Sequence, residues 1–182
     1  MAFAHIQAAV RASDQGLQGR LFDRRSAPAG RGAETFCVSM EESRGLNRAD
    51  LQLLSRTRLR EARLLLRNGE YSGAYYLSGL AVECALKACV ARRTQRFDFP
   101  NKSHAIKSYS HDLERLLVAA RLKNSLRFEM RRNPALDERW GIVLGWKVSC
   151  RYETIDKDSA RILYEAVAPR SDGVFGWIRR HW

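Results

Sequence analysis

The chain has 182 residues and a formal net charge of +12, from 32 lysines and arginines against 20 aspartates and glutamates. This length suits one domain that buries its own core without crosslinks, and the charge favours polyanionic partners, nucleic acid first. The four cysteines form no CxxC pair and no zinc-type spacing with histidine. We therefore expect no metal site, no cofactor and no disulfide framework, in keeping with a reducing cytoplasm.

Residues 1–45 differ in composition from the rest of the chain. The stretch "GRLFDRRSAPAGRGAETF" mixes Gly, Ala, Pro, Ser and Arg with little apolar periodicity, so we expect a disordered N-terminal extension. An alternative is a misassigned start site, because the purine-rich codons of Glu41 and Glu42 resemble a bacterial ribosome-binding site shortly before Leu46. The folded domain is then expected over residues 46–182.

The first predicted helix begins after Asn47, a suitable N-cap, and ends at the "NGE" of residues 68–70. Its apolar residues share one side. The opposite side carries arginines at i, i+4, i+7 and i+11, here called the arginine ridge: Arg56, Arg60, Arg63 and Arg67. Two interpretations stay open for the ridge, a solvated surface and a contact with a polyanion.

The second predicted helix, residues 71–92, is apolar around most of its circumference and should lie at the centre of a bundle. Glu83, Lys87 and Arg92 interrupt this apolar run, so no membrane span of roughly 18 uncharged residues is predicted. The remaining side of the helix is a narrow line of small and polar residues, here called the polar seam: Ser72, Tyr76, Gly79, Glu83 and Lys87.

Beyond a long basic connection, Ser110 should cap a helix over 111–122. Further helices are expected at about 124–131, 136–148, 156–168 and 171–181, with Trp140 and Trp146 anchoring the bundle. The last stretch, "GVFGWIRRHW", interleaves aromatic and basic residues. It fits either a nucleic-acid patch or a helix pinned by its tryptophans, and we favour the second. No stretch has the period of a strand with hairpin turns, so the fold class is all-α.

Three separated pieces resemble the HEPN superfamily: "AYYLSGLAVECALKA" at 74–88, "YSHDLERLL" at 109–117 and "RY" at 151–152. The resemblance implies an antiparallel up-and-down helical bundle, here with extra C-terminal helices, that commonly forms homodimers. It also implies RNA or nucleotide as ligand and a toxin-antitoxin or defence context with a nucleotidyltransferase partner. Ribonuclease branches of the superfamily carry an Arg, four to six residues and a His, and no histidine of this chain has that spacing.

Metal-independent RNA cleavage needs a base, a proton donor and a cation, and His111, Arg151 and Tyr152 are residues of the right types. They would serve only if the fold brings them together. Glu83, on a buried helix, requires a cationic partner, for which Lys87 and Arg151 are the candidates. Tyr76 could stack on a base, although aromatic residues on a central helix are more often core.

Three functions follow as expectations. The first is a HEPN-like domain that binds nucleotide or RNA, with the arginine ridge, Tyr76, Glu83 and Lys87 as the binding or cleft-organising residues. The second is a metal-independent endoribonuclease centred on His111 and Arg151. The third is a non-enzymatic module whose polar seam serves only dimerisation or the binding of a nucleotidyltransferase. In that case replacing Gly79 by leucine should break the assembly.

Overall fold

A computed structural model describes residues 46–93, 109–169 and 172–182. The predicted extension over residues 1–45, with its alternative start at Leu46, lies outside these ranges, as does most of the predicted basic connection. Every regular element in the described ranges is helical, which confirms the all-α class. The helices are α2 (Arg48–Arg67), α3 (Tyr71–Arg93), α5 (Leu113–Ala119), α6 (Lys123–Arg132), α7 (Pro134–Leu144), the 3-10 helix η1 (Val148–Tyr152), α8 (Lys157–Val167) and α9 (Val174–Arg179).

Helix α2 begins and ends where the sequence predicts. The Asn47 side chain accepts a hydrogen bond from the Asp50 backbone N–H at 3.1 Å, and the Asp50 carboxylate accepts one from the Asn47 N–H at 3.1 Å. This capping box satisfies two backbone donors that would otherwise lack partners. Gly69, with a φ of 82°, then reverses the chain into α3, a conformation that other residues rarely adopt.

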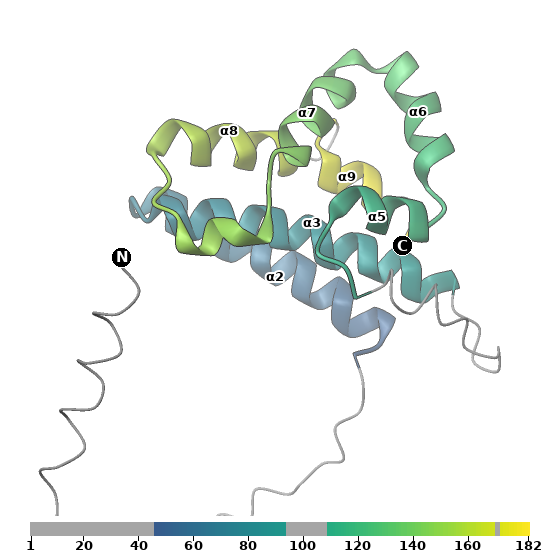
Figure 1. The fold of residues 1–182 in the computed structure, drawn as a ribbon, viewed down its shortest axis with the longest axis horizontal. Coiled ribbons are helices and arrows are strands. Elements are labelled where there is room, and N and C mark those ends of the chain that lie inside the picture. Colours follow the sequence, from purple (N-terminus) through teal and green to yellow (C-terminus); the bar gives the residue numbers. More distant parts are fainter. Residues whose placement is uncertain (1–45, 94–108, 170–171) are drawn as a thin grey trace, which may run out of the picture. The chain divides into compact units, whose positions relative to one another are not determined.

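Helix α3 is the centre of the domain. It contacts α2, α5, α8, α9 and η1, and Figure 1 shows α2 and α3 side by side beneath the later helices. Its alanines at 74, 81, 85 and 88 are fully buried. Among the described helices only α3 is long and apolar enough to span a membrane, and 67% of that stretch is buried within the domain, as in the core helix of a soluble protein.

Two predicted helices need correction. The cap of α5 is Asp112, whose carboxylate accepts a hydrogen bond from Arg115 N, whereas Ser110 accepts one from Asp112 N. His111 therefore precedes the helix instead of lying in its first turn. Helix α7 ends at Leu144 and not at 148, because Gly145 closes it and the chain turns to bury Trp146.

The later helices complete the core. Trp140 and Trp146 are buried, as expected for anchors of the bundle. Trp177 on α9 is buried as well, and Trp182 lies edge-on to Phe175 with ring centroids 5.7 Å apart. The two arginines between these tryptophans are exposed. The docked C-terminal helix that we favoured is therefore the one observed.

Candidate functional site

The polar seam of α3 is covered by other parts of the same chain. At its N-terminal end, Ser72 Oγ accepts a hydrogen bond from Ile155 N at 2.9 Å. The rings of Tyr76 and Trp146 lie 6.4 Å apart, and the indole of Trp146 occupies the space where a side chain at Gly79 would project. The first half of the seam is thus an internal packing surface, beneath the segment that joins α7 to α8.

The second half of the seam contains Glu83, the acidic residue of the buried helix. Glu83 is only 2% exposed. Its Oε1 accepts a hydrogen bond from Lys87 Nζ at 2.8 Å, and its two carboxylate oxygens lie 3.0 and 3.1 Å from Nδ1 of His111. One carboxylate therefore holds two basic side chains, one from its own helix and one from the entry to α5.

This arrangement fixes how His111 can react. A carboxylate next to Nδ1 favours the tautomer with its proton on that nitrogen, which leaves Nε2 able to accept a proton. The His111 side chain is 54% exposed, so Nε2 is within reach of a ligand from solvent. The pairing of a buried carboxylate with an accessible imidazole is the geometry that orients a general base.

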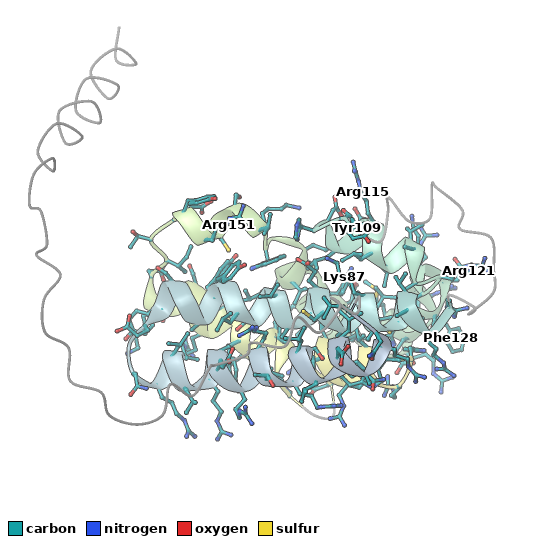
Figure 2. All side chains as sticks on the ribbon, turned by 90° about the horizontal axis from the view of Figure 1, so that it is seen from below. Lys87, Tyr109, Arg115, Arg121, Phe128 and Arg151 are labelled. Carbon is teal, nitrogen blue, oxygen red and sulfur yellow. The ribbon has the colours of Figure 1, made fainter. Side chains whose placement is uncertain are left out.

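The surroundings of His111 are basic and aromatic. Tyr109 is 83% exposed, and Figure 2 shows it with Lys87 and Arg115 near the start of α5. The only ion pair of Arg115 in the described ranges is a 3.8 Å contact with Asp112, and both side chains are exposed. Such a pair contributes little stability, so Arg115 is free to meet an anionic ligand.

Arg151 and Tyr152 do not join this cluster. Both are exposed on η1, and the Arg151 guanidinium lies 4.9 Å from the Tyr152 ring centroid. Figure 2 shows Arg151 set apart from Lys87 and Tyr109, over a different part of α3. In the described part of the chain, Glu83 pairs with Lys87 and His111 and not with Arg151. Catalysis by His111, Arg151 and Tyr152 together required the fold to bring them into one site. In the described ranges His111 contacts Glu83, whereas Arg151 contacts Tyr152.

The arginine ridge forms a separate feature on α2. All four of its arginines are exposed, and none has an ion pair within the described residues. Arg58, which lies outside the ridge, pairs with Glu61 at 2.6 Å. Arg56 lies with its guanidinium 5.6 Å from the Trp182 ring centroid. The ridge is thus a row of positive charges that no carboxylate of the described chain neutralises.

The buried thiols are poor candidates for chemistry. Burial raises the pKa of Cys84 and of Cys89 to about 11 each, so both are protonated at neutral pH. Cys84, Cys89 and Cys150 are all free and buried. Within the described ranges, no group of three or more His, Cys, Asp or Glu residues is placed to hold a metal ion.

Comparison with known proteins adds one finding. A family model described as the HEPN domain matches residues 54–133. No curated protein and no solved structure matches the chain. The matched segment contains the arginine ridge together with Glu83, Lys87 and His111, whereas Arg151, Tyr152 and the helices after α6 lie beyond it.

Proposed function

Because the chain belongs to the HEPN superfamily, we propose that it binds RNA or nucleotide phosphates as a component of a toxin-antitoxin or related defence system. The observation that carries this proposal is the arginine ridge. Exposed arginines that lack carboxylate partners retain their full charge for a ligand, and guanidinium groups bind phosphate oxygens in a bidentate manner. The net charge of +12 adds a field that attracts polyanions.

The geometry of the ridge favours an extended ligand. Its first and last arginines, Arg56 and Arg67, are 11 positions apart on one helix, which corresponds to about 16 Å at 1.5 Å per residue. A row of this length can meet several successive phosphates of one strand, whereas a mononucleotide would occupy only part of it. We therefore propose single-stranded RNA as the ligand of the ridge, bound through its backbone with little dependence on base sequence.

The test compares two charge-matched variants. The ridge variant replaces Arg60, Arg63 and Arg67 by glutamine, and the control variant replaces Arg127, Arg131 and Arg132 on α6, which are also exposed. Titration against labelled single-stranded RNA at low salt should show a loss of about 30-fold or more for the ridge variant and a several-fold smaller loss for the control. Equal losses would mean that net charge alone attracts RNA, and the proposed site on α2 would then be wrong.

The contact between Glu83 and His111 favours a second candidate function, metal-independent cleavage of RNA. In this reaction Nε2 of His111 takes the proton of a 2′-hydroxyl, the 2′-oxygen attacks phosphorus to form a 2′,3′-cyclic phosphate, and the 5′-oxygen leaves with a proton from water. Lys87, which bonds the same carboxylate oxygen as His111, supplies a cation for the charge that develops on phosphate. Glu83 acts here as the residue that positions His111.

Cleavage is tested on a gel with the purified chain in EDTA. The candidate predicts cleavage products that disappear in His111→Ala and decrease in Glu83→Gln, while both variants still bind RNA through the ridge. An intact substrate with the unmodified protein would contradict the candidate, and so would cleavage that persists in His111→Ala. Neither outcome bears on phosphate binding by α2.

We also propose that the chain forms a homodimer and that it binds a nucleotidyltransferase. Trp146 of the same chain fills the space at Gly79, so we do not propose this part of the polar seam as the dimer contact. Leu53 and Leu64 on α2 are 60% and 52% exposed, which supports a protein contact beside the ridge. Light scattering should report a dimer that Leu53→Asp with Leu64→Asp dissociates, and a monomeric native protein would contradict the dimer.

A further inference from the structure

A pocket lies on the side of the bundle where α9 meets α2 and the end of α8. Its volume is about 400 Å³, and its lining residues are Leu59, Ala168, Pro169, Phe175, Gly176, Arg179, Arg180 and Trp182. This volume falls within the range of small-molecule sites. The lining combines apolar and aromatic surface with two arginines, and none of these eight residues is acidic.

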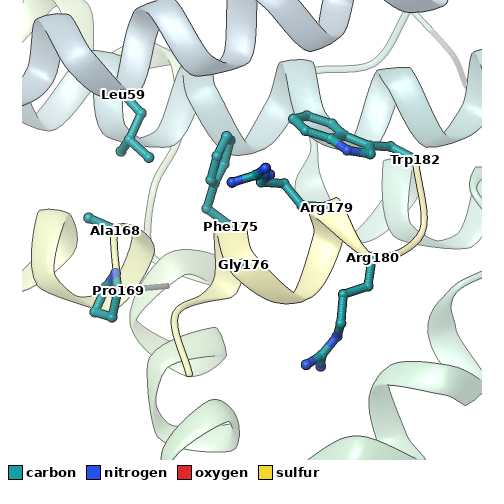
Figure 3. Close-up of a pocket in the computed structure, with 8 residues that line it drawn as sticks. All are labelled: Leu59, Ala168, Pro169, Phe175, Gly176, Arg179, Arg180 and Trp182. Carbon is teal, nitrogen blue, oxygen red and sulfur yellow. The ribbon is translucent and has the colours of Figure 1, made fainter. Parts of the chain in front are cut away.

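The two arginines of the pocket differ in what they contact. Arg180 bonds Glu129 at 3.1 Å, and Figure 3 shows it directed away from the aromatic rings. Arg179 has no carboxylate partner in the described ranges, and Figure 3 shows its guanidinium between Phe175 and Trp182. Its distance to the Trp182 ring centroid is 5.9 Å. Arg179 is therefore the pocket cation that remains available to a ligand.

The contacts that hold these arginines on Trp182 are weak. Arg56 and Arg179 lie 5.6 and 5.9 Å from the Trp182 ring centroid, close to the outer limit of about 6 Å for a cation–π interaction. Both side chains are exposed and keep most of their freedom. A ligand can therefore displace a guanidinium from the indole face. The displaced guanidinium can then pair with the negative charge of the ligand.

The electrostatic environment near the pocket is positive. Burial lowers the pKa of His181, and the charge of Arg180 lowers it further, with smaller effects in the same direction from Arg92 and Arg93. Glu129 acts in the opposite direction, but Arg180 already binds it. A negative group that enters this region therefore meets an excess of positive charge.

We propose that this pocket binds a small molecule that joins a planar aromatic ring to an anionic group, as a nucleoside monophosphate does. The ring stacks on Trp182 and contacts Phe175, and the anionic group pairs with Arg179. This site is distinct from the part of the ridge formed by Arg60, Arg63 and Arg67, which binds backbone phosphates and offers no aromatic surface. The ligand is either a free nucleotide or the phosphorylated end of an RNA strand.

The experiment titrates the full chain with AMP and with GMP by calorimetry, and with adenosine and inorganic phosphate as partial ligands. The mononucleotides should bind at least tenfold more tightly than either partial ligand, because only they use both the indole and Arg179. Arg179→Gln and Trp182→Leu should each weaken binding about tenfold. The matched control is Arg161→Gln, an exposed arginine on α8 that should have no effect. Circular dichroism verifies that each variant is folded.

A competition assay separates the two sources of the ligand. Displacement of AMP by an oligonucleotide with a 5′-phosphate, and not by its dephosphorylated form, identifies an RNA end. Retention of AMP in the presence of both oligonucleotides identifies a free nucleotide.

Two results would overturn the proposal. One is the absence of binding at about 5 mM AMP or GMP, where a site with a Kd of ~1 mM is mostly filled. The other is binding that survives both Arg179→Gln and Trp182→Leu. The ridge variant keeps Arg56, Arg179 and Trp182, so AMP binding should be unchanged in it. Loss of RNA binding in that variant with AMP binding intact would separate the two sites, and failure of either proposal leaves the other standing.

Discussion

Helices α2 and α3 are neighbours in sequence and in space, yet they carry charge in opposite ways. On α2, the arginine ridge is exposed and has no ion pair within the described residues. On α3, Glu83 is buried and bonded to both Lys87 and His111. The charge of the arginine ridge is presented to solvent, whereas the charge of Glu83 is used inside the domain to fix the entry of α5.

The difference separates two kinds of polar residue that look alike in a sequence. An exposed arginine costs the fold little and can be replaced with small effect on stability. A buried carboxylate is tolerated only with partners, and its loss leaves those partners without one. Variants on α2 should therefore change binding, and variants on the polar seam of α3 should change folding.

The largest effect on stability is expected at Gly79. Any side chain at this position meets the indole of Trp146, so Gly79→Leu should lower the free energy of unfolding by about 3 kcal/mol or more. The measurement is urea denaturation followed by circular dichroism. Gly141 is the matched control, because no other atom lies within 4 Å of a Cβ added there. Gly141→Ala should raise stability by about 0.5–1 kcal/mol, and equal effects at the two glycines would contradict the packing described for the seam.

The second prediction for stability concerns Glu83. Glu83→Leu removes the shared partner of Lys87 and His111 and should lower the free energy of unfolding by about 2–3 kcal/mol. Lys87 and His111 reach solvent, which keeps the loss below that of a fully buried pair. Glu165→Leu on α8 breaks an exposed contact with Arg161 and should change stability by less than about 0.5 kcal/mol. If the two variants lose the same free energy of unfolding, the contacts of Glu83 with Lys87 and His111 do not stabilise the fold.

An effect that is absent at neutral pH and appears only at alkaline pH concerns the two thiols on α3. Burial raises the pKa of each thiol from its ordinary value of 9.0 to about 11, so the folded state holds these protons more tightly than the unfolded state. Stability is then complete below about pH 9 and falls as pH rises towards 11, by about 2 kcal/mol per thiol. Unfolding at a series of pH values should show this slope. Replacing Cys84 and Cys89 by alanine should flatten it, and an unchanged slope would assign alkaline unfolding to other groups.

The smallest effect on stability is expected for the ridge variant. Its three side chains are exposed and unpaired, so its free energy of unfolding should stay within about 0.5 kcal/mol of the unmodified protein. Thermal denaturation measures this directly. A loss above about 2 kcal/mol would show that the ridge supports the fold, which would erase the contrast with α3.

Local signals in the sequence account for most of the fold. Asn47 and the turn at Gly69 placed the ends of α2, and the continuous apolar pattern placed α3 at the centre. Local spacing also identified Lys87 as a partner of Glu83, because residues four apart on a helix are neighbours. The error at the end of α7 has a physical cause. The apolar pattern includes Trp146 and therefore predicted that the helix continues through it. The chain instead turns after Gly145, and this turn brings Trp146 into the core.

The rest of the site depends on contacts between residues distant in sequence. His111 follows Glu83 by 28 positions, and nothing in the spacing pairs them. Trp146 fills the space at Gly79 from another element, so the first half of the polar seam is internal packing in this chain. Glu83 pairs with Lys87 and His111, whereas Arg151 stacks on its neighbour Tyr152. The pocket beside Trp182 is lined by residues of α2, of α9 and of the segment that follows α8, and no sequence motif indicates it.

The salt dependence of RNA binding tests most directly whether the arginine ridge on α2 contacts RNA phosphates. The unmodified chain, the ridge variant and the α6 control variant are titrated with single-stranded RNA over a range of salt concentrations. Each phosphate contact contributes about 0.7 to the slope of log affinity against log salt for single strands. We expect the slope of the ridge variant to be shallower by about 2 and the slope of the control to be nearly unchanged. Parallel slopes for all three proteins would contradict the assignment of phosphate binding to α2.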